Sequence, residues 1–155
     1  EAIPGETIES LLPGFRGVWD ALQIAIDTPP DVLSHNLETV PRKYRRVRPQ
    51  AKYQRSLDLL LKVKEEGIRS KTGIMVGLGE TREEVIELMQ DCVDHKVDVL
   101  TIGQYMQPTK MHHPVVDWVH PDQFAEYKEI GEKLGIGHVE SGPLVRSSYH
   151  AERHV

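Results

Sequence analysis

Residues 72–102 decide the fold, and they read TGIMVGLGETREEVIELMQDCVDHKVDVLTI. The stretch begins with an apolar run at 72–77 and ends with a second at 97–102, which predicts two strands covered on both faces. Between the runs, Thr81 and Glu84 have the spacing of a capping box, which marks the start of a helix. An apolar stripe follows at helical spacing, formed by Val85, Leu88, Met89, Cys92 and Val93. The stretch therefore predicts a strand–helix–strand unit with parallel strands.

The same alternation extends toward both ends of the chain. Apolar runs predict further strands at 8–12, at 32–35 and, more weakly, at 138–145. Helical periodicity predicts further helices at 53–66, 121–134 and 18–26. Repeated strand–helix units indicate an α/β fold of the (β/α) barrel type. Since a closed barrel of this type has about 250 residues, a chain of 155 residues can form only part of one.

Composition excludes several classes of protein. With 39% hydrophobic and 28% charged residues, the chain can bury a core and is not a disordered tail. Its net charge of -5 argues against a nucleic-acid coat, and no apolar stretch is long enough for a membrane span. The only cysteine, Cys92, excludes a disulfide framework and is expected to be inert on its apolar stripe. The chain begins with Glu1 without a signal segment, and we expect it to be processed or cut from a longer protein.

Polar residues directly after the predicted strands are the first candidates for a binding site, because parallel α/β folds bind ligands at the carboxyl ends of their strands. Asn36 and Glu38 follow the strand at 32–35. An amide and a carboxylate at this place could hold the hydroxyl groups of a sugar. An Asx-type turn followed by a helix-capping acid is the structural alternative.

Two further strand ends carry candidate residues. The glycine-rich run from Gly77 to Glu80 follows one strand, and Gln104 with Tyr105 follows the next. Glycines let a ligand approach the backbone, and glutamine beside tyrosine can bind a planar heterocycle by hydrogen bonds and stacking. A tight turn in the first case and a solvent-facing loop in the second remain the alternatives.

Basic residues are concentrated at 41–48 of an otherwise acidic chain. Arg48 precedes a proline and is the best candidate there for a carboxylate contact, although a solvated basic surface is the more usual explanation of such a run. The polar segment 141–150 is either a loop near a site or a frayed tail.

A zinc site is the last possibility that the residue types raise. Its ligands would be His112, His113, His120 and Asp117. The spacing does not put two histidines on one helix face, and prolines interrupt the segment, so zinc is disfavoured.

Four segments together resemble the lipoyl synthases, a family of radical S-adenosylmethionine (SAM) enzymes. They read HNLETVP at 35–41, GLGET at 77–81, LTIGQYMQP at 100–108 and GPLVRSSY at 142–149. Their order and separation match that family over residues 8–151. The resemblance implies a partial (β/α)6 barrel with two [4Fe–4S] clusters, which cleaves SAM and inserts two sulfur atoms at C6 and C8 of an octanoyl group.

The resemblance also assigns roles to single residues. Arg146 and Ser148 belong to the closing Arg-Ser-Ser-Tyr motif, and Ser148 matches the serine ligand of the auxiliary cluster, which is the sulfur donor. Gly73 and Met75 begin the family's Gly-x-Ile-x-Gly-x-x-Glu motif, with Met75 in place of isoleucine. Together with the candidate Arg48, the expected SAM contacts are Asn36, Glu38, Gly77, Glu80, Gln104 and Tyr105.

One departure from the family is large: both cysteine triplets that hold the clusters are absent. The resemblance therefore implies the C-terminal half of a lipoyl synthase. Residues 1–137 would be the C-terminal half of the barrel, and 138–155 an extension with the Arg-Ser-Ser-Tyr motif. Alone, this half is expected to hold no cluster and to be inactive. Because its sheet would leave open edges, we expect it to be marginally stable, oligomeric or completed by the missing half.

The same resemblance implies the partners. They are an octanoylated lipoyl carrier domain or H protein, an electron donor and the missing N-terminal half, with no nucleic acid and no membrane. The compartment would be a bacterial cytoplasm or a mitochondrial matrix. Two alternatives remain open at this point: a non-catalytic half-barrel that binds SAM, adenosine compounds or an acidic carrier domain, and a non-functional fragment.

Overall fold

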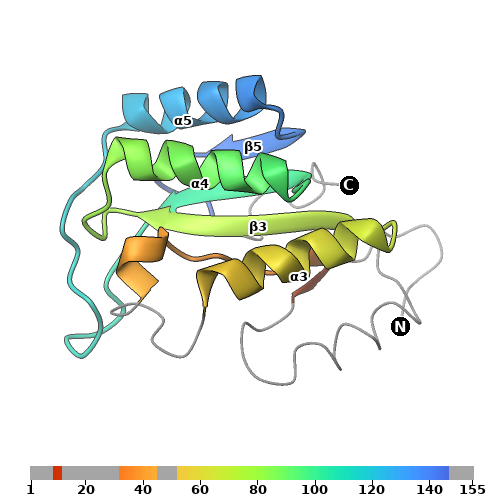
Figure 1. Ribbon diagram of the computed structural model, residues 1–155. Helices are drawn as coiled ribbons and strands as arrows, with labels where there is room; N and C mark the ends of the chain where they lie inside the picture. Colours follow the sequence, from red (N-terminus) through yellow and green to blue (C-terminus); the bar gives the residue numbers. More distant parts are fainter. Residues whose placement is uncertain (1–8, 12–31, 45–51, 147–155) are drawn as a thin grey trace.

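The computed structural model describes residues 9–11, 32–44 and 52–146 (Figure 1). Within these ranges five parallel strands form one sheet in the order β1-β2-β3-β4-β5. They are β1 (Glu9–Leu11), β2 (Val32–Ser34), β3 (Arg69–Val76), β4 (Val99–Gln104) and β5 (His138–Ser141). Each overlaps a segment where the sequence predicts a strand, so the existence of these strands is confirmed, although β3 begins at Arg69 instead of 72 and β4 extends to Gln104 instead of 102.

Three helices connect the strands: α3 (Tyr53–Glu65), α4 (Arg82–Asp94) and α5 (Pro121–Leu134). A short 3-10 helix, η1 (Pro41–Lys43), precedes them. The capping box of α4 is present, with the Thr81 and Glu84 side chains each accepting from the other residue's backbone N–H. The helix predicted at 18–26 lies outside the described residues.

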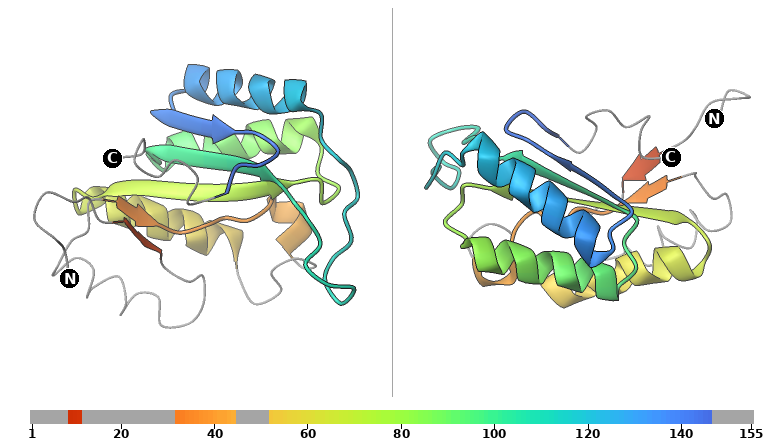
Figure 2. Two further views of the ribbon diagram at one scale, coloured as in Figure 1. Left: turned by 180° about the vertical axis from the view of Figure 1, so that it is seen from behind. Right: turned by 90° about the horizontal axis from the view of Figure 1, so that it is seen from above.

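All three helices cover the same face of the sheet, as the views from behind and from above show (Figure 2). Strands in consecutive order with every helix on one side are the arrangement of a (β/α) barrel, whereas a doubly wound sheet has helices on both sides. The predicted fold class, the C-terminal portion of a partial barrel, is therefore confirmed. In the described part of the chain no helix is long and apolar enough to cross a bilayer.

The core lies between the sheet and the helices. Ile74 and Val76 of β3, with Leu100 and Ile102 of β4, pack against apolar residues of the helices. The helix residues of this core include Leu57, Leu60, Val85, Leu88, Met89, Phe124 and Tyr127.

The opposite face of β3 and β4 is also buried, as predicted for strands covered on both faces, but its residues are smaller and more polar than those of the core. On β3 and β4 this inner face carries Lys71, Gly73 and Met75, then Val99, Thr101 and Gly103. Lys71 is fully buried there despite its charge. Small and polar residues on the inner face leave room for a cavity, and this is where the candidate site lies.

The proposed division at residue 137 remains a prediction. β5 belongs to the same sheet as the other strands, and residues 147–155 of the proposed extension lie outside the described ranges.

Candidate functional site

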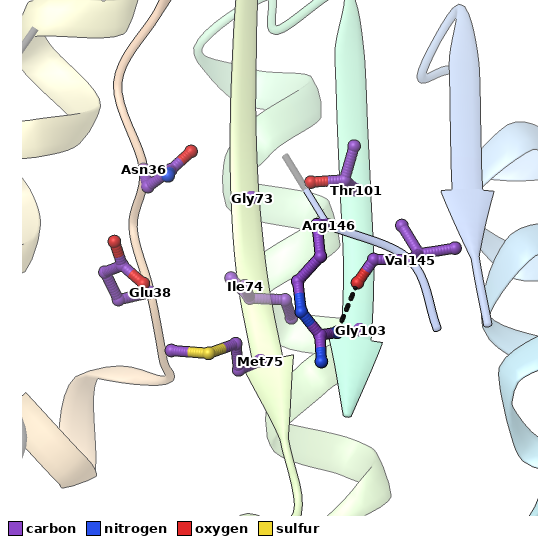
Figure 3. Close-up of a pocket in the computed structure, with 9 residues that line it drawn as sticks. All are labelled: Asn36, Glu38, Gly73, Ile74, Met75, Thr101, Gly103, Val145 and Arg146. Carbon is purple, nitrogen blue, oxygen red and sulfur yellow. Dashed lines mark hydrogen bonds between the residues drawn. The ribbon is translucent and has the colours of Figure 1, made fainter. Parts of the chain in front are cut away.

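A cavity of about 120 Å³ lies on the inner face, toward the carboxyl ends of β3 and β4 (Figure 3). Its lining residues are Asn36, Glu38, Gly73, Ile74, Met75, Thr101, Gly103, Val145 and Arg146. The sequence identified Asn36, Glu38 and Arg146 as candidates and placed Gly73 and Met75 in a motif. It missed Thr101, Gly103 and Val145. Thr101 and Gly103 could have been found from their spacing of two along a strand, which puts them on one face.

Asn36 and Glu38 reach the cavity through a bulge after β2. Ser34 pairs with Lys71, so a regular ladder would pair Leu37 with Ile74, but the residue that pairs with Ile74 is Glu38. One extra residue is therefore inserted between Ser34 and Glu38. The Glu38 amide donates to the Gly73 carbonyl at 2.9 Å, and the Glu38 carbonyl accepts from the Met75 amide at 2.8 Å.

Glu38 has a positive φ of 72°, which is strained for a residue other than glycine. Ile74, its pairing partner, has its side chain in the helix-facing core, and the left-handed backbone aims the Glu38 side chain into the cavity instead (Figure 3). The alternative of a helix-capping acid is not what the structure shows, because Val40 occupies the N-cap position of η1.

Two glycines allow close approaches at the cavity. A Cβ on Gly73 would lie 2.5 Å from the Thr101 Oγ1 atom, and a Cβ on Gly103 would lie 2.1 Å from the Val145 carbonyl oxygen. The second contact shows that the segment after β5 crosses directly over β4. Arg146 then extends along the cavity, where its guanidinium donates to the Val145 carbonyl at 2.8 Å and contacts the Met106 sulfur at 3.5 Å (Figure 3).

The segment from Gly77 to Glu80 forms a tight turn. The Glu80 carboxylate accepts from the Gly77 amide at 3.1 Å and from the Leu78 amide at 3.0 Å. Burial raises the pKa of Glu80, and these amide donors oppose the rise. Glu80 therefore holds the turn in place. Neither Gly77 nor Glu80 lines the cavity, so the predicted SAM contacts at these two residues stay predictions.

Gln104 and Tyr105 hold the loop between β4 and α5. The Gln104 amide nitrogen donates to the carbonyls of Tyr105 at 2.9 Å and Asp117 at 3.0 Å, and its oxygen accepts from the Val119 amide at 2.9 Å. The Tyr105 hydroxyl donates to the His113 carbonyl at 2.6 Å. Both side chains are buried beneath the loop and do not line the cavity, so their predicted contact with adenosine also stays a prediction.

The histidines of the disfavoured zinc site have separate structural partners. His112 contacts the Thr109 hydroxyl, His113 contacts the Pro114 carbonyl, and His120 accepts the Asp122 amide as N-cap of α5. Across the described ranges no group of three possible metal ligands occurs. Burial raises the pKa of the Cys92 thiol, which is consistent with its predicted inertness.

The basic run is described only in part. The Arg42 guanidinium donates through Nε and Nη2 to the two carboxylate oxygens of Glu84, each at 2.9 Å. It also donates to the Gly79 carbonyl at 2.9 Å, so this arginine links η1 to the start of α4. Arg48 and Ser148 lie outside the described residues.

The chain matches the radical SAM superfamily over residues 2–92. A protein named lipoyl synthase from Caldanaerobacter subterraneus subsp. tengcongensis is 57% identical over 152 residues, which are 97% of this chain and 54% of that protein. A protein named mitochondrial lipoyl synthase from Nematostella vectensis is 54% identical over 153 residues, 98% of this chain and 53% of that protein. The chain thus spans about half the length of the curated relatives it matches.

Two solved structures share the fold at low sequence identity. Hydroxymethylglutaryl-CoA lyase from Pseudomonas aeruginosa matches 90% of this chain and 45% of its own with a TM-score of 0.61 and 11% identity. Streptococcus suis SuiB bound to S-adenosylmethionine matches 85% of this chain and 27% of its own with a TM-score of 0.54 and 15% identity. These likenesses concern the fold alone.

Proposed function

This chain belongs to the radical SAM superfamily, and from this membership we propose that it is the C-terminal half of a lipoyl synthase. The support is the high identity to proteins of that name together with the four matching segments. The observation that carries the proposal is the cavity, which brings Asn36 and Glu38, from the segment after β2, together with Arg146, from the segment after β5.

The lining of the cavity fits SAM. The Glu38 carboxylate can accept hydrogen bonds from ribose hydroxyls or an amino group, and the Asn36 amide can both donate and accept. The Arg146 guanidinium can bind a carboxylate. Gly73 lets the Thr101 hydroxyl and the Asn36 amide lie close to the β3 backbone, since a Cβ there would be 2.5 Å from the Thr101 Oγ1 atom and 3.2 Å from the Asn36 Oδ1 atom. SAM, when bound, supplies the 5′-deoxyadenosyl group, and these residues would bind and orient it.

The [4Fe–4S] clusters do not fit the described residues. Clusters are held mainly by cysteine thiolates, and the single cysteine is buried in the core with a raised pKa. Their cysteine ligands would belong to the remaining half of the parent polypeptide, with Ser148 as the one ligand that this chain is proposed to contribute.

For the whole enzyme, the proposed reaction is the insertion of two sulfur atoms at C6 and C8 of an octanoyl group. The octanoyl group would be attached to a lysine of a lipoyl carrier domain or H protein, and an electron donor would be required. The expected compartment is a bacterial cytoplasm or a mitochondrial matrix. This chain alone would be inactive.

The test uses the full-length parent with its clusters assembled. It should release 5′-deoxyadenosine from SAM and form lipoyl groups on an octanoylated carrier domain. Ser148→Ala should impair lipoyl formation far more than SAM cleavage, because Ser148 is assigned to the sulfur-donating cluster. Equal loss of both would remove Ser148 from that role, and no SAM cleavage by the unmodified parent would refute the enzyme.

A second candidate function is a non-catalytic module that binds SAM or a carrier domain. It is favoured by one observation: the cavity is formed by this chain's own residues. Calorimetric titration of the 155-residue chain with SAM, and separately with a carrier domain, tests it. Binding to either one supports the module, and binding to neither contradicts it.

A further inference from the structure

Thr72 places a hydroxyl where packing alone would favour an apolar side chain. It pairs with Leu100 across β3 and β4 and is fully buried. The neighbouring side chains on this helix-facing side, Ile74 and Ile102 among them, belong to the apolar core. Valine has nearly the same shape as threonine and would pack equally well in this layer. A buried hydroxyl costs free energy unless it forms a hydrogen bond, so the partner of the Thr72 hydroxyl matters.

The Thr72 hydroxyl accepts a hydrogen bond from the Leu37 amide, which the bulge removes from the regular hydrogen-bond ladder between β2 and β3. The Lys71 carbonyl accepts from the His35 amide at 3.0 Å, and a regular strand would next bring the Leu37 amide to the Gly73 carbonyl. The bulge gives that acceptor to the Glu38 amide instead. The Leu37 amide turns to the Thr72 Oγ1 atom at 3.0 Å, and Leu37 is itself fully buried.

We propose that Thr72 is a positioning residue, whose hydroxyl fixes the bulge and thereby aims Asn36 and Glu38 into the cavity. Without the hydroxyl, the Leu37 amide would lose the buried acceptor that Thr72 provides, and the bulge would be held less firmly. The strained backbone of Glu38 depends on that bulge. That the ligand oriented in this way is SAM rests on the proposed function; the role of Thr72 in the bulge does not.

The chain offers a matched control at Thr39. This threonine is also buried, and its hydroxyl has no hydrogen-bond partner within the described residues. Thr72→Val and Thr39→Val are thus the same chemical change, but only the first removes an acceptor from the bulge. Thr72→Ser restores the hydroxyl and serves as the rescue variant.

Two measurements on the full-length parent test the proposal. The first is amide hydrogen exchange in the peptide spanning residues 32–44, without SAM. Thr72→Val should speed exchange of the Leu37 and Glu38 amides about tenfold or more, as loss of a buried hydrogen bond implies. Thr72→Ser and Thr39→Val should leave it unchanged. The second measurement is the Kd for SAM, which should rise about tenfold in Thr72→Val and recover in Thr72→Ser.

Each outcome decides a separate question. If Thr72→Val and Thr39→Val exchange alike, the positioning role is overturned. If Thr72→Val speeds exchange but the unmodified parent does not bind SAM, the positioning role stands and the proposed ligand is wrong. Should Thr72→Val fail to fold, Thr72→Ala replaces it with Thr39→Ala as its control, because these two changes also remove one buried hydroxyl each and only the first is the acceptor of the Leu37 amide. Equal exchange in these two variants would then overturn the positioning role.

Discussion

The side chain of Gln104 holds the loop between β4 and α5 through three hydrogen bonds to its backbone. Its amide group joins the end of β4 to Asp117 and Val119 near the far end of the following loop. The side chain is buried, so each of its polar atoms needs a partner, and the loop provides all of them. Glutamine at this position therefore specifies the path of the loop.

The isosteric change Gln104→Glu tests this interpretation. It replaces two amide donors by a carboxylate oxygen that would face the Tyr105 and Asp117 carbonyls. We expect the free energy of unfolding to fall by about 2–3 kcal/mol in urea denaturation of the full-length parent, in which this and the following substitutions are measured. Gln107→Glu is the control, since Gln107 is exposed and donates to the His112 carbonyl at the loop surface. Equal effects of the two substitutions would contradict the role assigned to Gln104.

The start of α4 depends on an ion pair as well as on its capping box. The hydrogen bond from Arg42, with smaller help from the Thr81 amide, lowers the pKa of Glu84 from 4.5 to about 2. A carboxyl group whose pKa is lower in the folded state stabilises the fold above the unfolded pKa and loses this effect as the pH falls. The contribution of Glu84 is therefore complete above about pH 4.5 and disappears toward pH 2.

Glu84→Gln should lower the free energy of unfolding by about 1 kcal/mol at pH 7, since the pair is partly solvent-exposed and screened. The difference from the unmodified protein should shrink between pH 4.5 and pH 2. Urea denaturation across this range measures it. Glu83→Gln, in the same helical turn but exposed, is the control. A difference that stays constant with pH would mean that the charge of Glu84 does not contribute.

The outer edge of β5 is closed by side chains of α5. Lys128 donates to the Val139 carbonyl at 2.9 Å, and the Glu132 carboxylate accepts from the Val139 amide at 3.4 Å. The two side chains are also paired with each other at 2.8 Å. Free backbone groups at a strand edge are a template for pairing with another chain, and this ion pair blocks them at Val139.

Replacing both Lys128 and Glu132 by alanine should therefore promote self-association through β5. The control replaces Glu129 and Lys133 on the same helix, which form a similar ion pair at 2.9 Å between largely exposed side chains. Sedimentation velocity over a range of concentrations should show larger species for the first double variant than for the second. Identical profiles would show that the pair has no protective role at the edge.

In the molecule as a whole, the two outer strands of the described sheet, β1 and β5, differ in how their free edges are covered. Among the described strands, the capping of β5 leaves β1 as the edge at which the proposed N-terminal half would add further strands. The inner face carries the cavity, which further strands would enclose in a more complete barrel. An incomplete sheet of this kind is expected to gain stability from the rest of the polypeptide.

The 155-residue chain alone should therefore behave as a larger species in size-exclusion chromatography or melt without a cooperative transition. Mixed with the separately produced remainder of the parent, it should give one complex with one copy of each part and a higher melting temperature. Light scattering coupled to chromatography measures the composition. A compact monomer with a cooperative melt for the chain alone would contradict this dependence.

The described strands and the helices α3, α4 and α5 could be predicted from the sequence, because helical periodicity, the capping box and the apolar runs are local signals. Thr81, Glu84 and the stripe from Val85 onward fix α4 without reference to the rest of the molecule. The sequence also identified Asn36, Glu38 and Arg146, since polar residues at strand ends and a specific motif are visible in one dimension. Their meeting in one cavity depends on the order of the strands.

Only the tertiary structure decided how the remaining residues are used. The acceptors of Gln104 and Glu80 are backbone groups set by the turns, and no residue type reveals them in advance. The bulge that aims Glu38 requires β2 and β3 in register, and the crossing over Gly103 requires the segment after β5 to return across β4. These features arise from contacts between distant parts of the chain, whereas periodicity and motifs report only what neighbouring residues favour.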